Sequence, residues 1–311
     1  MINRTMVRTK VMQCLFAYYQ DGDKTVHQSR KDLLKSFSDT YNLYGMLLSL
    51  MDELSTYAGQ QIAESENRAK ATHRVYVANR HFAQSSLAQQ VFSLRALRHL
   101  MDENHLSWDA GMSVMPILMK QLQEKDYYRS FMQLDAPTYE DEKGLWKKIY
   151  SDLLPDNEAL MEALEEMEIS LDQANWSTDL NVVLSYVVKT LKRFSQEAGA
   201  DQELLQIFDS EEELRFGEKL LEEAISRKQE LMEKINAHLK NWDMERIAYM
   251  DQIILQAALT EIYAFPDIAA EVSMNEYIEL AKEYSGDKSY LFVNGILEEI
   301  LRSEKNFKLA K

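Results

Sequence analysis

The fold of this chain is decided in its last third. The three decisive stretches read DQIILQAALTEI (residues 251–262), SMNEYIELAK (273–282) and KSYLFVNGIL (288–297). In the first stretch, Ile254, Ala258 and Ile262 recur every four residues, which indicates the apolar face of an amphipathic helix. Apolar pairs follow the same spacing in the third stretch. We therefore expect a compact antiparallel helical bundle over residues 210–311.

Two of these helices carry the pattern of a capping box at their expected starts. Ser210 is followed three residues later by Glu213, and Ser273 is followed three residues later by Glu276. In such a box the serine hydroxyl accepts a backbone hydrogen bond from the first turn, and the glutamate side chain reaches back to the backbone N–H of the serine. We expect one helix to begin just after Ser210 and another just after Ser273.

Residues that break helices are scarce: the chain has nine glycines and four prolines among 311 residues. Folds rich in β structure need many turns, which these two residues supply. The composition therefore favours an all-α protein with short connections. Apolar periodicity predicts a first helix over residues 5–19 and further helices over 30–64, 86–105 and 178–195.

Charge is distributed unevenly along the chain. Lys+Arg total 35 and Asp+Glu total 51, and the net charge of −16 argues against non-specific nucleic-acid binding by the chain as a whole. Two acidic blocks, residues 140–179 and 201–223, account for the excess, whereas residues 1–20 and 67–100 contain no acid. Residues 67–100 combine six basic with three aromatic side chains, a mixture typical of single-strand nucleic-acid surfaces. The same arginines could equally form a solvated face or pair with the acidic blocks.

Motifs of catalysis and metal binding are absent from the sequence. It has no glycine-rich phosphate loop and no His-Glu-x-x-His helix. Its single cysteine, Cys14, falls in the apolar region of the first helix, where a buried thiol is expected. The chain has no apolar run of about 18 residues, and its N-terminus lacks the apolar core of a secretory signal. We expect a cytoplasmic protein that is not an enzyme and has no metal, cofactor or membrane partner.

The C-terminal blocks, together with an arginine-bearing first helix over residues 4–20, resemble the NusB family of transcription antitermination factors. The shared features are Asn275-Glu276 ahead of Leu280-Ala281-Lys282, and an intact Phe292-Val293-Asn294-Gly295. The resemblance implies an all-α fold of two helical bundles with no enzymatic activity. It also implies binding of the boxA RNA of ribosomal RNA transcripts jointly with NusE, a small-subunit ribosomal protein, with an indirect effect on the RNA polymerase elongation complex.

The resemblance also assigns roles by position. The residues expected to bind RNA are Arg4, Arg8, Lys10, Lys288, Ser289 and Phe292, and those expected to face the protein partner are Phe16 and Asp251. Arginines in an acid-free helix start are well suited to phosphate contacts. Two alternatives stay open at this point. Phe292, at helical spacing from Ile296, could equally pack in the core, and Gly295 could permit close helix packing.

The chain is about twice the usual length of this family. We expect residues 1–20 to form the first helix of the NusB-like fold, residues 210–311 its C-terminal bundle, and residues 21–209, approximately, a helical insertion. One alternative function is a protein-interaction module that keeps the fold but has lost specific RNA binding. Another, a ribosomal RNA cytosine methyltransferase with a NusB-like domain, is disfavoured because the sequence has no cofactor-binding glycine loop and no pair of catalytic cysteines.

Overall fold

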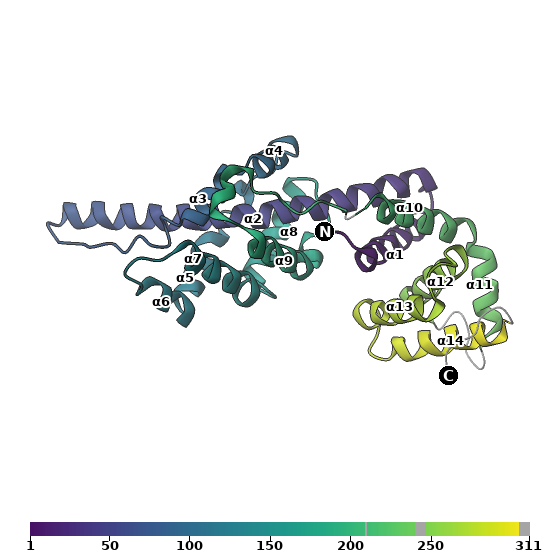
Figure 1. Cartoon of the computed structure of the whole chain (residues 1–311). Helices are drawn as coiled ribbons and strands as arrows, with labels where there is room; N and C mark the ends of the chain where they lie inside the picture. The colour runs from purple at the N-terminus through teal and green to yellow at the C-terminus, as the bar shows by residue number, and fades with distance from the viewer. Residues whose placement is uncertain (209, 240–246, 305–311) are drawn as a thin grey trace. The chain divides into compact units, whose positions relative to one another are not determined.

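The computed structural model describes residues 1–208, 210–239 and 247–304 of the 311-residue chain. Within these ranges the regular structure is helical, and β structure is limited to one isolated bridge between Ile2 and Phe208. The prediction of an all-α fold is therefore confirmed. The chain divides into two compact units, Met1–Phe37 with Phe208–Lys311, and Ser38–Ile207 (Figure 1). None of the described helices combines the length and the apolar character needed to span a membrane.

The first unit is built around helix α12. Its helices are α1 (Arg4–Gln20), the first turns of α2 (Val26–Ala71), α10 (Glu211–Ser226), α11 (Lys228–Ala237), α12 (Tyr249–Ala264), α13 (Ala270–Tyr284) and α14 (Ser289–Ser303). α12 packs against α1, α10, α11, α13 and α14. Every side chain from Ile253 to Ile262 is buried, so this helix is covered on all sides. The sequence predicted an amphipathic helix with one buried face. That prediction is wrong, because neighbouring helices surround α12 and bury its other faces as well.

The expected helix start at Ser210 is correct in position but not in its hydrogen bonding. α10 begins at Glu211 with Ser210 as its N-cap, yet the serine side chain makes no capping hydrogen bond. Glu213, the expected partner in the box, instead forms an ion pair with Arg4, with 3.3 Å between the guanidinium Nε and the carboxylate Oε2. A tertiary contact to α1 has thus replaced the local one.

The expected start at Ser273 is wrong. α13 begins three residues earlier, at Ala270, and Ser273 is fully buried within the helix. Its hydroxyl donates a 2.6 Å hydrogen bond to the Glu261 carboxylate on α12, while Glu276 accepts hydrogen bonds from side chains on α1. Both polar residues of the pattern serve contacts between helices, which a local motif cannot reveal.

The second unit is organised along the rest of α2. It contains α3 (Ser86–Ser93), α4 (Arg95–Glu103), α5 (Val114–Gln123), α6 (Asp126–Met132), α7 (Tyr139–Lys148), α8 (Glu158–Ser170) and α9 (Trp176–Arg193), with short helical turns over Asp109–Gly111, Ile149–Leu153 and Gln196–Asp201. Buried aromatic side chains donate hydrogen bonds to backbone carbonyls of α2. The Trp176 indole reaches Asp39 at 2.7 Å, and the Trp108 indole reaches Met46 at 3.2 Å.

Two helices of this unit differ in extent from those that periodicity predicted. α2 is one continuous helix of 46 residues, longer at both ends than residues 30–64. The predicted helix over 86–105 is two helices, because Leu94 leaves the helical conformation with φ −60° and ψ 117°. Leu94 remains fully buried, so its apolar side chain preserves the periodic pattern across a break in the backbone.

Helices α1 and α10 cross closely at Gly217. A Cβ atom at this position would lie 2.8 Å from Val7 Cγ1 and 3.4 Å from the Phe37 ring. Only a residue without a side chain therefore permits this crossing. The alternative that Gly295 allows close helix packing is wrong, because nothing lies within 4 Å of its Cβ position.

This contrast gives a matched pair of stability predictions. Gly217→Ala should lower the free energy of unfolding by about 1–3 kcal/mol, because the new methyl group overpacks the crossing. Gly295→Ala should leave stability unchanged or raise it by up to about 1 kcal/mol through helix propensity. Urea unfolding followed by circular dichroism measures both. Equal effects of the two substitutions would contradict the assignment of close packing to Gly217.

Candidate nucleic-acid interface

Helix α1 presents its first arginine at the surface. Asn3 caps the helix by accepting a 3.0 Å hydrogen bond from the Met6 backbone N–H. The Arg4 side chain, 41% exposed, pairs with Glu213 and lies over the Phe216 ring with 5.4 Å to the ring centre. These contacts hold Arg4 in place while leaving part of its guanidinium accessible to a phosphate.

Arg8, one turn further along α1, lies in the interior. Its Nε and Nη2 donate hydrogen bonds of 2.8 and 2.7 Å to the two carboxylate oxygens of Glu261, and Nη1 donates to Glu276 at 3.1 Å. Tyr277 and Ser273 also donate to Glu261, at 3.1 and 2.6 Å. Burial, the largest single effect, lowers the pKa of Arg8. The hydrogen bond and charge of Glu261, together with smaller contributions from Tyr277 and Glu276, outweigh it, so the pKa is raised.

The burial of Arg8 changes the role that the sequence suggested for the basic residues of α1. The Arg8 side chain is only 4% exposed, and both of its acidic partners already engage it. Lys10 is fully buried as well. Of the three cations on α1, the structure leaves Arg4 as the one placed to meet a ligand at the surface. We therefore assign Arg8 a structural role, joining α1 to α12 and α13.

A pocket of about 330 Å³ brings together four of the residues that the resemblance singled out. Its lining consists of Ile247, Ala248, Asp251, Gly286, Asp287, Lys288, Ser289 and Phe292. Lys288 is exposed and stands directly before the first residue of α14, and Phe292 lies one turn into that helix, partly exposed. The pocket thus joins a cation, an aromatic side chain and a helix N-terminus, a combination that suits a nucleotide.

Asp251 organises the floor of this pocket. It is only 4% exposed, and its carboxylate oxygens accept hydrogen bonds from Ser285 at 2.6 Å and Ser289 at 2.9 Å. The two serine hydroxyls are also 3.0 Å apart. Asp251 therefore ties the start of α12 to the turn between α13 and α14. In this arrangement it positions neighbouring side chains and presents little surface to a partner protein.

Phe16 lies at the surface of α1 next to an aromatic residue that the sequence reasoning missed. Its ring is 5.8 Å from that of Tyr249, in an edge-to-face arrangement, and both side chains are exposed. Nearby, Lys228 places its ammonium group 3.8 Å from the Tyr19 ring centre. Tyr249 opens α12 and is distant from Phe16 in sequence, so no local pattern could pair them.

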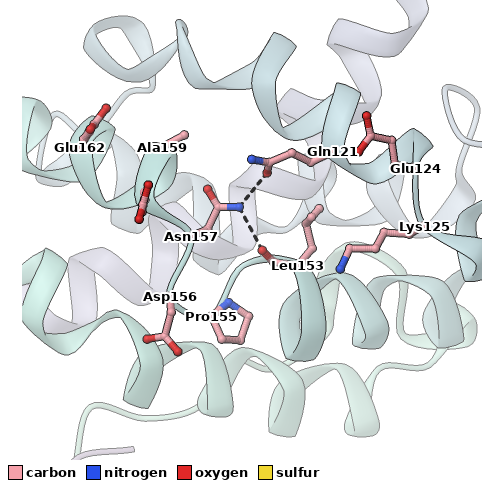
Figure 2. A pocket seen from close by; sticks show the side chains of 10 residues that line it. Gln121, Glu124, Lys125, Leu153, Pro155, Asp156, Asn157, Ala159 and Glu162 are labelled. Atoms are coloured by element: carbon pink, nitrogen blue, oxygen red, sulfur yellow. Dashed lines mark hydrogen bonds between the residues drawn. The ribbon is translucent and has the colours of Figure 1, made fainter.

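A pocket in the second unit has a different chemical character. It measures about 680 Å³, and its lining includes the acids Glu124, Asp156, Glu158 and Glu162 and a single cation, Lys125 (Figure 2). Asn157 donates to Gln121 at 2.7 Å and to the Leu153 carbonyl at 3.1 Å, while its oxygen caps α8. This asparagine is therefore occupied by structural contacts. A pocket with four carboxylates repels phosphate, so we do not assign it to RNA.

Two features of the described residues bear on metal binding and nucleophilic catalysis. Within the described ranges, no group of three or more His, Cys, Asp or Glu side chains could hold a metal ion. Cys14 is buried, as the sequence predicted, and burial raises the pKa of its thiol to about 12. At neutral pH this thiol is protonated and is not an activated nucleophile.

Comparison with known proteins identifies relatives of the chain. A sequence model of the NusB family matches residues 158–302. The transcription antitermination protein NusB of Geobacter sp. (strain M21) is 38% identical over 136 residues, 44% of this chain and 91% of the relative. The NusB proteins of Methylacidiphilum infernorum and Macrococcus caseolyticus are 39% and 40% identical, over 33% and 29% of this chain and 76% and 68% of their own lengths. No solved structure gives a significant match.

These matches place the chain in a class of all-α transcription antitermination proteins. It belongs to the NusB family. The matched range begins at Glu158, the first residue of α8, and extends almost to the end of α14. It therefore covers α8 and α9 of the second unit as well as α10 to α14. The assignment of residues 21–209 to an insertion stays a prediction.

The Arg8 ion pair gives a stability prediction. Arg8→Met should lower the free energy of unfolding by about 3–5 kcal/mol, because it leaves Glu261 charged and buried without its main partner. The matched control is Arg215→Met, which removes an exposed pair with Glu211 and should cost at most about 1 kcal/mol. Urea denaturation measures both. The double variant Arg8→Met/Glu261→Gln should lose less stability than the two single variants added together. Full additivity would contradict a direct pair.

The buried thiol gives a reactivity prediction. Because burial raises the pKa of Cys14 to about 12, the folded chain should not react with Ellman's reagent at about pH 8. The same chain in urea should release one equivalent of thiolate product, since its single cysteine is then exposed. Rapid labelling of the folded protein at the unfolded rate would show that Cys14 is accessible.

Proposed function

We propose that this chain is an RNA-binding antitermination factor that recognises boxA-like RNA together with a NusE-type ribosomal protein. The observation that carries the proposal is the pocket at the start of α14, where Lys288, Ser289 and Phe292 meet. Membership of the NusB family supports the same role. In this proposal the chain is not an enzyme. It acts in the cytoplasm and affects the elongating RNA polymerase indirectly.

The proposed RNA contacts divide by chemistry. Lys288 meets a phosphate, aided by the partial positive charge at the N-terminus of α14. Phe292 offers a partly exposed aromatic ring for a base, and Ser289 lines the pocket between them. Asp287 on the same rim offsets the charge of Lys288, so attraction of phosphate there is weak. Base stacking therefore contributes a large share of affinity at this pocket. Arg4 supplies a second, separate phosphate contact.

The proposed partner surface is centred on Phe16 and Tyr249. Two exposed aromatic rings in edge-to-face contact provide rigid apolar area of the kind that anchors protein interfaces. Asp251 contributes from the interior, because its bonds to Ser285 and Ser289 fix the geometry of α12 and α14. On this view Phe16 faces the partner directly, whereas Asp251 acts by positioning.

A binding comparison tests the proposal. The full chain should bind a boxA-like RNA more tightly than a scrambled RNA of the same composition, and addition of NusE should increase the difference. Fluorescence anisotropy at several salt concentrations measures both affinities. Equal affinity for the two RNAs with NusE present would overturn the proposal. Partner binding without any RNA binding would favour the alternative, a protein-interaction module.

Substitutions at the pocket make the prediction specific to residues. Lys288→Gln should weaken boxA binding and reduce the salt slope by about 0.7, the value for one phosphate on single-stranded RNA. Phe292→Leu keeps the apolar volume but removes the stacking face, and should cost about 1–3 kcal/mol of binding free energy.

The control for these variants is Arg302→Gln, which removes an exposed arginine near the other end of α14. It should leave both the affinity and the salt slope unchanged. Thermal unfolding of each variant separates lost binding from lost folding. A Phe292→Leu protein that binds normally would place this side chain in the core and not on the RNA.

A further inference from the structure

The C-terminal end of α2 projects beyond the other helices of the second unit, and the chain returns beside it in an extended conformation (Figure 1). The reversal is well defined. The His73 N–H donates to the Lys70 carbonyl at 3.2 Å, and the Arg74 N–H donates to the Ala69 carbonyl at 2.8 Å. His73 adopts a left-handed conformation with φ 51°. These are the hydrogen bonds of a Schellman motif, which ends a helix with a fixed turn.

This tip is basic. Arg68, Lys70 and Arg74 are all exposed, and no acidic residue occurs from residue 67 to residue 100. Arg68 is 3.6 Å from Glu64, but both side chains are largely in solvent, where such a pair contributes little. Basic residues near a helix C-terminus interact favourably with the helix dipole, and this accounts for the positions of Arg68 and Lys70. Arg74 lies beyond the helix and is not explained in that way.

The returning segment exposes an unusual amount of apolar surface. Val75 is 94% exposed, Tyr76 46% and Val77 87%. The segment is nevertheless anchored, because Arg80 pairs with Glu66 on α2 and the Asn79 amide donates to the Met132 carbonyl on α6. A held, extended segment with exposed apolar side chains beside exposed cations is suited to a ligand that is both anionic and flat.

A pocket of about 460 Å³ adjoins the segment. Its lining includes the aromatic side chains of Tyr57, Tyr76 and Tyr128 and the amide side chains of Gln61, Asn79 and Gln123. This lining contains no acid and one exposed cation, Lys120, unlike the acidic pocket of Figure 2. Within the described ranges, the side-chain amides of Gln61 and Gln123 have no hydrogen-bond partner. Aromatic faces and free amides are the groups that read an unstacked base.

We propose that the tip of α2, the returning segment and this pocket form a second contact surface for single-stranded RNA. Arg68, Lys70 and Arg74 meet phosphates, and a base stacks on Tyr76 at the rim of the pocket. The surface lies in the second unit and includes no residue of the α14 pocket, so it goes beyond the function proposed above. An acidic protein would match the charge, but it gives no reason for an acid-free pocket of aromatic and amide groups beside the cations.

The test uses the full chain and poly(U), a single strand with no boxA sequence. The triple variant Arg68→Gln/Lys70→Gln/Arg74→Gln should reduce the slope of log affinity against log salt by about two, at about 0.7 for each phosphate. The matched control is Lys189→Gln/Lys192→Gln/Arg193→Gln, which removes three exposed cations from the end of α9 in the same unit. The control should leave the slope nearly unchanged.

A second pair of variants tests the stacking. Tyr76→Leu should weaken poly(U) binding by at least about fivefold, whereas Phe92→Leu, at another exposed aromatic of this unit, should have no effect. Circular dichroism checks that each variant folds. Equal slope losses in the two triple variants would overturn the proposal. Unchanged RNA binding by the tip variant would also overturn it, even if the tip were then found to bind a protein.

The two proposals fail in different ways. If the chain does not discriminate between boxA and scrambled RNA, the function proposed for the α14 pocket fails. If the tip variant leaves the salt slope of poly(U) binding unchanged, the proposal for the tip fails.

Discussion

The buried ion pair between Arg8 and Glu261 is the interaction on which the first unit depends. It joins α1, at the start of the chain, to α12, more than 250 residues later. Because both charges are removed from water, neither is stable in the interior without the other. The carboxylate of Glu261 also accepts hydrogen bonds from two hydroxyl groups of α13. Once this pair forms, the position of α1 is fixed, and with it the surface positions of Arg4 and Phe16.

Polar residues on α12 extend this principle along a helix whose buried side chains are mostly apolar. Asp251 accepts hydrogen bonds from Ser285 and Ser289, at the turn before α14 and at its start. Gln256 donates hydrogen bonds to Tyr19 and to a backbone carbonyl of α10, and Glu261 accepts them from Arg8. Apolar packing alone would allow α12 to rotate with little penalty. These three buried polar side chains, which bond to neighbouring segments, admit one rotation and one register of α12. The α14 pocket is a consequence, since its floor is the Asp251 network.

Much of the fold could be predicted from local patterns. The scarcity of glycine and proline indicated an all-helical chain, and periodicity located α1 and α9 closely. Prediction failed where one pattern has two physical causes. Leu94 keeps the apolar period across a break between helices, and Ser273 with Glu276 matches a capping box while serving contacts between helices. Hydrophobic spacing reports burial and not backbone continuity.

Sequence patterns were sufficient to establish the helical class, the family and a set of candidate site residues. Which of those candidates lie at the surface became evident only from the packing of the helices. Arg4 and Arg8 look alike in the sequence, one turn apart in an acid-free helix, yet Arg4 is partly in solvent and Arg8 is enclosed by Glu261 and Glu276. Burial depends on which distant helices pack against a side chain. The acids that enclose Arg8 come from segments far along the chain, and no local pattern connects them to it.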